Sequence, residues 1–152
     1  MTPEEQIRPR VDTQVQHKHV VERWLDFVNA TGGGSITEMW APGCVVHPGG
    51  GLPEVRGTDA LEGLIKAFRG AFPDLRVTTE DAVVQGDRVA ARFTTRGTHL
   101  GPFMHLAPTG KQVEFAGFGV FRFAEGKIVE EWVLDDLLAL MNQLAAPPAI
   151  ST

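Results

Sequence analysis

The sequence contains a single cysteine, Cys44, and no tyrosine among its 152 residues. One cysteine cannot form a disulfide within the chain, which agrees with a reducing compartment. Without tyrosine, no phenolic hydroxyl can serve as an oxyanion donor. The spacing of zinc ligands is also missing, because His17 and His19 would lie nearly opposite each other on a helix. We therefore expect a cytoplasmic protein without a metal site.

Long apolar runs and basic clusters are also missing. No apolar run approaches the roughly 20 residues that a membrane-spanning helix needs, and the first residues, MTPEEQIRPR, lack the apolar segment of a secretory signal. The net charge is −5 with no clustered Lys or Arg, which argues against nucleic acid and anionic membranes as partners. The APTGK string lacks the spacing of a P-loop, so no phosphate cradle is expected.

The patterns that are present predict one α+β domain spanning residues 1–152, with mobile tails at 1–13 and 145–152. Helical periodicity covers Val15–Val28, the stretch from Thr58 or Asp59 to Phe72, and Leu137–Leu144, and a brief β-type run covers Cys44–His47. Alternating residues then predict four consecutive strands at Leu75–Gln85, Arg88–His99, Lys111–Phe123 and Lys127–Leu134. Short turns join neighbouring strands, so we expect a curved antiparallel sheet with helices across one face and a conical cavity between them.

The last predicted strand carries the first candidate for chemistry. One parity of this strand reads Ile128, Glu130, Trp132, Leu134 and Asp136, an apolar face that ends in a carboxylate just before a helix. In poorly hydrated surroundings the pKa of such a carboxylate rises, and it can then act as a general base near neutral pH. The alternative is structural, since either Asp135 or Asp136 could be the N-cap of the following helix.

Two histidines and several large side chains complete the candidate site. His47 and His99 each end a strand-like run beside glycines, where a neutral imidazole could polarise a carbonyl or return a proton. Both could equally be ordinary hydrogen-bonded residues. The large side chains favour a small hydrophobic or polycyclic ligand, and the candidates to contact it are Trp132, Trp40, Phe103, Met104, Phe115 and Phe118.

Three segments carry a likeness to a known family: FPDLRVTTEDAVVQGDRVAARFTTRGTHLGPF, APTGKQVEF and FRFAEGKIVEEWVLDDLLALMNQL. They resemble the SnoaL-like polyketide cyclases, which belong to the nuclear-transport-factor-2-like superfamily of cone-shaped α+β domains. The resemblance implies that the aspartate of an E-x-W-x-x-x-D motif, here Asp136, is the catalytic acid/base. Family cyclases also place a histidine on the preceding strand, whereas no histidine stands between Val113 and Phe123 in this sequence.

The resemblance implies a cofactor-free cyclase of the lyase or isomerase class that closes a ring of a polyketide-like substrate by an intramolecular aldol reaction. An epoxide-opening enzyme or isomerase of the same superfamily is an alternative, although Arg92 lacks the aspartate two residues later that epoxide hydrolases of this superfamily use. The other alternative is a non-catalytic domain that binds small molecules.

The strand Val113–Phe123 carries apolar residues on both parities, including Phe115 and Phe121 on one and Phe118 and Val120 on the other. A sheet with one face in water would show polar residues on that face. We therefore expect a partner subunit to cover the second apolar face in a homodimer.

Overall fold

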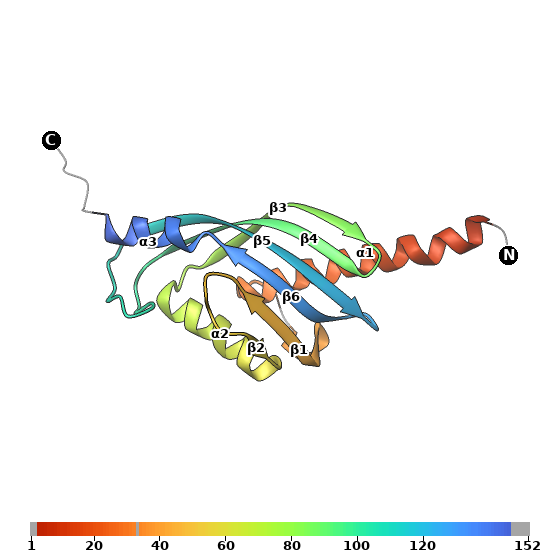
Figure 1. Ribbon diagram of the computed structural model, residues 1–152, viewed down its shortest axis with the longest axis horizontal. Coiled ribbons are helices and arrows are strands. Elements are labelled where there is room, and N and C mark those ends of the chain that lie inside the picture. Colours follow the sequence, from red (N-terminus) through yellow and green to blue (C-terminus); the bar gives the residue numbers. More distant parts are fainter. Residues whose placement is uncertain (1–2, 33, 147–152) are drawn as a thin grey trace.

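The computed structural model describes residues 3–32 and 34–146 and shows a six-stranded sheet with helices packed against it (Figure 1). In chain order the elements are α1 (Pro3–Val28), the 3₁₀ helix η1 (Ile36–Glu38), β1 (Trp40–Pro48), β2 (Val55–Arg56), α2 (Thr58–Ala71), β3 (Arg76–Gln85), β4 (Arg88–Thr98), β5 (Gln112–Ala124), β6 (Lys127–Asp135) and α3 (Leu137–Ala145). The predicted α+β cone is confirmed: α1 and α2 lie on one side of a curved, unclosed sheet, and α3 follows the end of β6. None of the helices in these described ranges is long and apolar enough to cross a membrane.

The strands follow the order β2-β1-β6-β5-β4-β3. The four predicted strands are confirmed as β3 to β6, which form an antiparallel meander. The first strand, β1, begins at Trp40 instead of Cys44. It pairs in parallel with β6, a pairing that the sequence did not predict. An irregular register between Trp40 and Val45 explains why the alternation is hard to recognise before Cys44.

The helices depart from the sequence boundaries mainly at the N-terminus. α1 begins at Pro3 and thus includes most of the segment predicted as an N-terminal arm. Proline is favoured in a first helical turn because its missing N–H would be unpaired there. α3 ends at Ala145. Of the two predicted tails, residues 1–2 and 147–152 lie outside the described residues.

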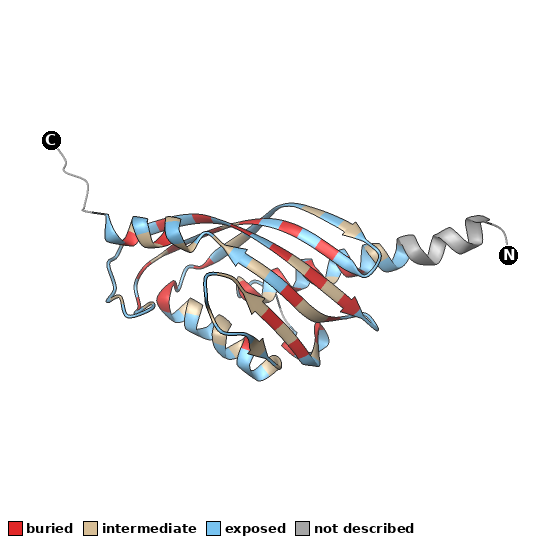
Figure 2. Ribbon diagram, viewed as in Figure 1, coloured by how far each residue is buried: buried red, intermediate tan, exposed pale blue. Residues whose placement is uncertain are grey.

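The core lies between the helices and the concave face of the sheet. Figure 2 shows buried and exposed residues alternating along β4 and β5, as expected for strands with one buried face. Trp24 of α1 meets Trp40 of β1 edge to face with ring centres 5.1 Å apart, and both indoles are almost completely buried. Trp40 in turn packs against Phe121 of β5, so that α1, β1 and β5 share one aromatic cluster.

Candidate functional site

A cavity of about 250 Å³ lies between the concave face of the sheet, α1 and α2, and the loop after β1 borders it. Apolar side chains form most of its wall, with Trp24 and Phe68 from the helices and Phe93 and Phe115 from the sheet. Among the lining residues, the exceptions are Thr95, Glu131 and Asp135, and no Lys, Arg or His lines the cavity within the described part of the chain. The cavity therefore combines an apolar wall with two carboxyl groups that have no cationic neighbour.

A β-bulge determines which carboxylates of β6 face this cavity. Opposite Phe123 and Arg122 of β5 stand Ile128 and Glu130, so Val129 is an extra residue in β6. An extra residue reverses the alternation that follows it, because the side-chain period of a strand is two. Ile128 is therefore buried, whereas beyond the bulge the inward positions fall on Glu131, Val133 and Asp135. The prediction that Glu130, Trp132 and Asp136 share the inner face with Ile128 is wrong for this reason.

Burial changes the acidity of both inward carboxyl groups. Glu131 is only 7% exposed, and burial, helped by the nearby charge of Asp135, raises its pKa from 4.5 to about 8. Burial also raises the pKa of Asp135 from 3.8 to about 6. Near pH 7 the site thus holds one carboxylate, at Asp135, and one neutral carboxylic acid, at Glu131. Such a pair provides a base and a hydrogen-bond donor from the same residue type.

Asp136, the predicted acid/base, has a structural role instead of a place in the cavity. Its exposed side chain is the N-cap of α3, and Oδ1 accepts a hydrogen bond from the backbone N–H of Ala139 at 3.0 Å. This is the alternative that the sequence left open, since a carboxylate at the N-cap satisfies one of the unpaired N–H groups of the first turn.

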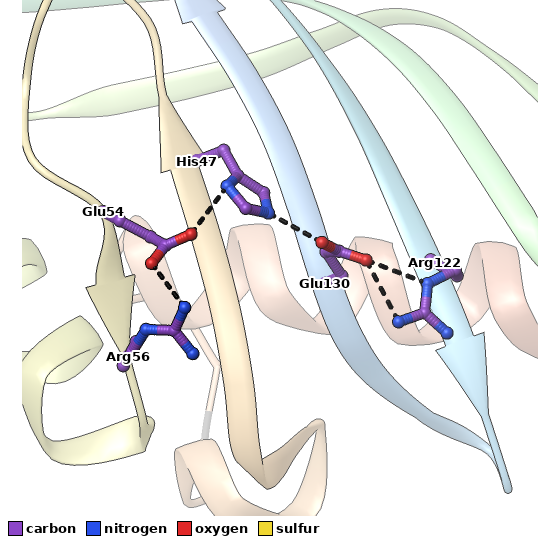
Figure 3. Close-up of polar contacts among 5 residues, drawn as sticks. All are labelled: His47, Glu54, Arg56, Arg122 and Glu130. Carbon is purple, nitrogen blue, oxygen red and sulfur yellow. Dashed lines mark hydrogen bonds and ion pairs between the residues drawn. The ribbon is translucent and has the colours of Figure 1, made fainter.

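His47, a predicted catalytic residue, lies on the outer face of the sheet within a chain of ion pairs (Figure 3). Its Nε2 is 2.7 Å from Oε2 of Glu130, and its Nδ1 is 3.1 Å from Oε1 of Glu54. Arg122 and Arg56 contact the far oxygens of the two carboxylates at 3.0 and 2.7 Å. The hydrogen bond from His47, together with the Arg122 guanidinium, lowers the pKa of Glu130. The network ties β2, β1, β6 and β5 together and does not border the cavity.

His99, the second predicted histidine, is completely buried beyond the end of β4 and also does not line the cavity. Its Nδ1 lies 3.0 Å from the hydroxyl of Thr109 and accepts a hydrogen bond from the Thr109 backbone N–H. The ring rests against Phe72 with centres 5.5 Å apart. His99 thus holds the loop between β4 and β5 against the end of α2.

The predicted ligand contacts are divided between the cavity, the core and the outer surface. Phe115 lines the cavity, and Trp40 is fully enclosed in the aromatic core. Phe118 and Trp132 lie on the outer face because they have the outward parity of β5 and β6, and both remain exposed. Phe103 packs against Phe68 and Phe72 outside the cavity, and Met104 is an exposed loop residue.

Sequence reasoning missed Glu131 and considered Asp135 only as a possible N-cap. One available signal was the pair of glycines in the β5 string Phe-Ala-Gly-Phe-Gly-Val-Phe, Gly117 and Gly119, because a glycine inside a strand indicates a close approach by another group. Their parity is that of Phe115 and Phe121, the inner face. No group of three metal-ligating side chains comes together within residues 12–32 and 34–146.

Known proteins are similar to this chain in sequence and in fold. The model of the SnoaL-like polyketide cyclase family matches residues 18–144. A proposed SnoaL-like polyketide cyclase from Jannaschia sp. CCS1 is similar in structure, with a TM-score of 0.81, 28% identity and coverage of 89% of this chain and 95% of that one. IdmH from Streptomyces antibioticus, a proposed polyketide cyclase, has a TM-score of 0.76 and 29% identity over 86% of this chain and 99% of its own. AclR from Streptomyces galilaeus, a proposed hydroxylase, has the same TM-score and identity over 91% and 87%. A search of the curated proteins found no match.

Proposed function

Because the chain belongs to the SnoaL-like polyketide cyclase family, we propose that it closes a ring of a small polycarbonyl substrate by an intramolecular aldol reaction, with Asp135 as the base. The observation that carries this proposal is the pair of carboxyl groups, Glu131 and Asp135, in an otherwise apolar cavity, where burial raises the pKa of both. An apolar cavity with a few convergent polar groups is the usual form of a small-molecule site.

The reaction begins when the carboxylate of Asp135 takes a proton from a methylene group that lies between two carbonyls. The C–H electron pair moves into the adjacent carbonyl and forms an enolate. The enolate carbon then attacks another carbonyl of the same molecule, which forms the new C–C bond and leaves an alkoxide on the second oxygen. The carboxylic acid of Asp135 returns its proton to this alkoxide, so the base is regenerated and no other reactant is consumed.

Glu131 is proposed to orient the substrate in its neutral form. A protonated carboxyl group donates one hydrogen bond, which a carbonyl oxygen of the substrate can accept. Four residues along a strand separate two Cα atoms by about 13 Å, so Glu131 and Asp135 would hold different parts of an extended or fused-ring substrate. With no cationic side chain on the wall, an uncharged ligand is favoured over a carboxylate.

The epoxide-opening alternative receives less support from the same geometry. Arg92 lies on the exposed side of β4, where its guanidinium forms an ion pair with Asp81 at 3.2 Å. An arginine on the outer face cannot polarise an epoxide in the cavity, which lies on the other side of the sheet.

We also propose that the chain forms a homodimer through the outer face of the sheet. Phe118 and Leu134 are 58% and 59% exposed there, next to Trp132 at 37%, and the neighbouring strands β5 and β6 supply all three. Burying such a patch against a second copy would remove apolar area from water.

The proton-transfer step can be tested without the natural substrate. Ethyl benzoylacetate has an acidic methylene between two carbonyls, and its exchange with D2O can be followed by proton NMR. Asp135→Asn should lower the protein-dependent exchange rate by roughly 10²–10⁴-fold, as expected for the loss of a general base. Asp136→Asn is the matched control, because asparagine caps a helix about as well as aspartate. Wild-type exchange in Asp135→Asn would refute the proposed base.

A further inference from the structure

Gly117 of β5 lies directly beside Asp135. The two residues are register partners across the antiparallel pair β5–β6, and both belong to the inner face of the sheet. A Cβ atom added to Gly117 would overlap with Oδ1 of Asp135. The carboxylate thus occupies the space that any other side chain at position 117 would need.

Backbone conformation does not explain this glycine. Gly117 is in the middle of β5 and is not among the glycines with positive φ, so its backbone is open to any residue. A glycine inside a strand weakens it, because it loses more conformational freedom on folding and leaves nothing to pack. The inner positions before and after the glycine pair, Phe115 and Phe121, hold large side chains. Space for the neighbouring carboxylate is the property that glycine alone supplies here.

We propose that Gly117 is a positioning residue that leaves space for the Asp135 carboxylate against the inner face of β5, where it borders the cavity. This inference rests on the proposed role of Asp135 as the base. With a methyl group at position 117, the carboxylate must rotate away from β5 toward the solvent. It would then be better hydrated, and its proton affinity would fall.

The first test follows the acidity of Asp135 directly. Carbon-13 NMR of the side-chain carboxyls, assigned with Asp135→Asn, would give the pKa of Asp135 in the wild type and in Gly117→Ala. The wild-type pKa should be about 6, and in Gly117→Ala it should move toward the ordinary value of 3.8. Where exchange of ethyl benzoylacetate is measurable, the acidic limb of its pH–rate profile should move in the same direction and the rate should fall. An unchanged pKa in Gly117→Ala would overturn the proposal.

Gly119→Ala is the matched control, since it adds the same methyl group to the same face of the same strand. Its Cβ would lie 3.3 Å from Cε2 of Phe93 and 3.8 Å from Oε2 of Glu131, so it crowds a ring edge and leaves Asp135 alone. The pKa of Asp135 should stay near 6 in this variant. An equal fall in both variants would mean that general crowding of β5 is responsible and would also overturn the proposal.

A double-mutant cycle keeps the test valid if Gly117→Ala folds poorly. In the Asp135→Ala background the overlapping carboxylate is gone. The fall in melting temperature that Gly117→Ala causes there should be less than about half of the fall that it causes in the wild-type background. An equal fall in melting temperature in both backgrounds, or failure to fold in both, would show that Gly117 is needed for something other than the Asp135 carboxylate.

These results remain separable from the proposed reaction. If the pKa and the cycle behave as expected while Asp135→Asn keeps the wild-type exchange rate, the positioning of the carboxylate stands and its role as the base fails. If Asp135→Asn loses exchange while Gly117→Ala leaves the pKa unchanged, the base stands and the positioning role of Gly117 fails.

Discussion

Asp135 and Asp136 are joined by one peptide bond, yet their carboxylates lie in opposite surroundings. Asp135 lines the apolar cavity, and Asp136 is exposed and caps α3 through Ala139. The adjacent residues differ because β6 ends at Asp135 and a strand sends successive side chains to opposite faces. Substitutions at the two positions should therefore have different effects on stability and on chemistry.

Asp136→Ala is expected to lower the free energy of unfolding by about 1 kcal/mol, because the first turn of α3 loses its side-chain acceptor. In a domain of this size that corresponds to a fall in melting temperature of roughly 2–4 °C. The exchange rate of ethyl benzoylacetate should remain close to that of the wild type. Thermal melts followed by circular dichroism would check the first effect. A rate loss of 10²-fold or more in a folded Asp136→Ala protein would restore Asp136 as the candidate base.

The rate of proton abstraction should follow a bell-shaped pH profile. Asp135 must be ionised, which requires a pH above about 6, and Glu131 must be protonated, which requires a pH below about 8. Glu131→Gln should keep a hydrogen-bond donor in the cavity and remove the alkaline limb, with the acidic limb retained. Initial exchange rates between about pH 5 and pH 9 would show both limbs. An alkaline limb that persists in Glu131→Gln must come from another group.

Stability should decrease as the pH rises through the same range. The pKa values of Glu131 and Asp135 are raised in the folded state, to about 8 from 4.5 and to about 6 from 3.8. At intermediate pH the folded protein therefore retains protons that the unfolded chain has released, which gives a negative slope of stability against pH. The contribution of these two groups to the free energy of unfolding is complete below their unfolded pKa values. It falls between about pH 4 and pH 8 and is constant above that range.

Urea unfolding at a series of pH values would measure this slope, and Glu131→Gln should flatten it, because glutamine cannot ionise. Asp81→Asn is a suitable control, since its carboxylate is exposed on the outer face. A wild-type free energy of unfolding that stays constant or increases from about pH 5 to pH 8 would contradict the raised pKa values.

The proposed dimer predicts that the protein has twice the monomer mass at micromolar concentration. Phe118→Glu places a charge in the exposed apolar patch and should yield a folded monomer, because burying an unpaired charge in an interface is costly. Leu138→Glu is the matched control, as Leu138 is 71% exposed on α3 and belongs to neither strand of that patch. Light scattering with size-exclusion chromatography would distinguish the masses. A monomeric wild type would rule out the dimer at that concentration.

Local patterns in the sequence were sufficient for the four-stranded meander and for α2 and α3. The alternation in residues 75–134, the two short turns and the helical periodicity of α2 depend on neighbours along the chain, and all of them predict the elements that form. The cone architecture followed from the same elements and from the family resemblance. The parallel pairing of β1 with β6 was not predicted, because the register that joins residues about 85 positions apart leaves no local pattern.

The identity of the inward carboxylates was decided only by the tertiary structure. The stretch Glu130-Glu131-Trp-Val-Leu-Asp135-Asp136 carries acids in adjacent pairs, so either strand parity sends one glutamate inward and leaves one aspartate on the inner side. Local alternation fits both strand parities and does not distinguish between them. The choice depends on the extra residue at Val129, which exists because β6 pairs with β5 in a register that accommodates a bulge opposite Arg122 and Phe123. The sequence by itself determined that one glutamate and one aspartate would lie on the inner side of this segment. The pairing of β6 with β5 decided that they are Glu131 and Asp135.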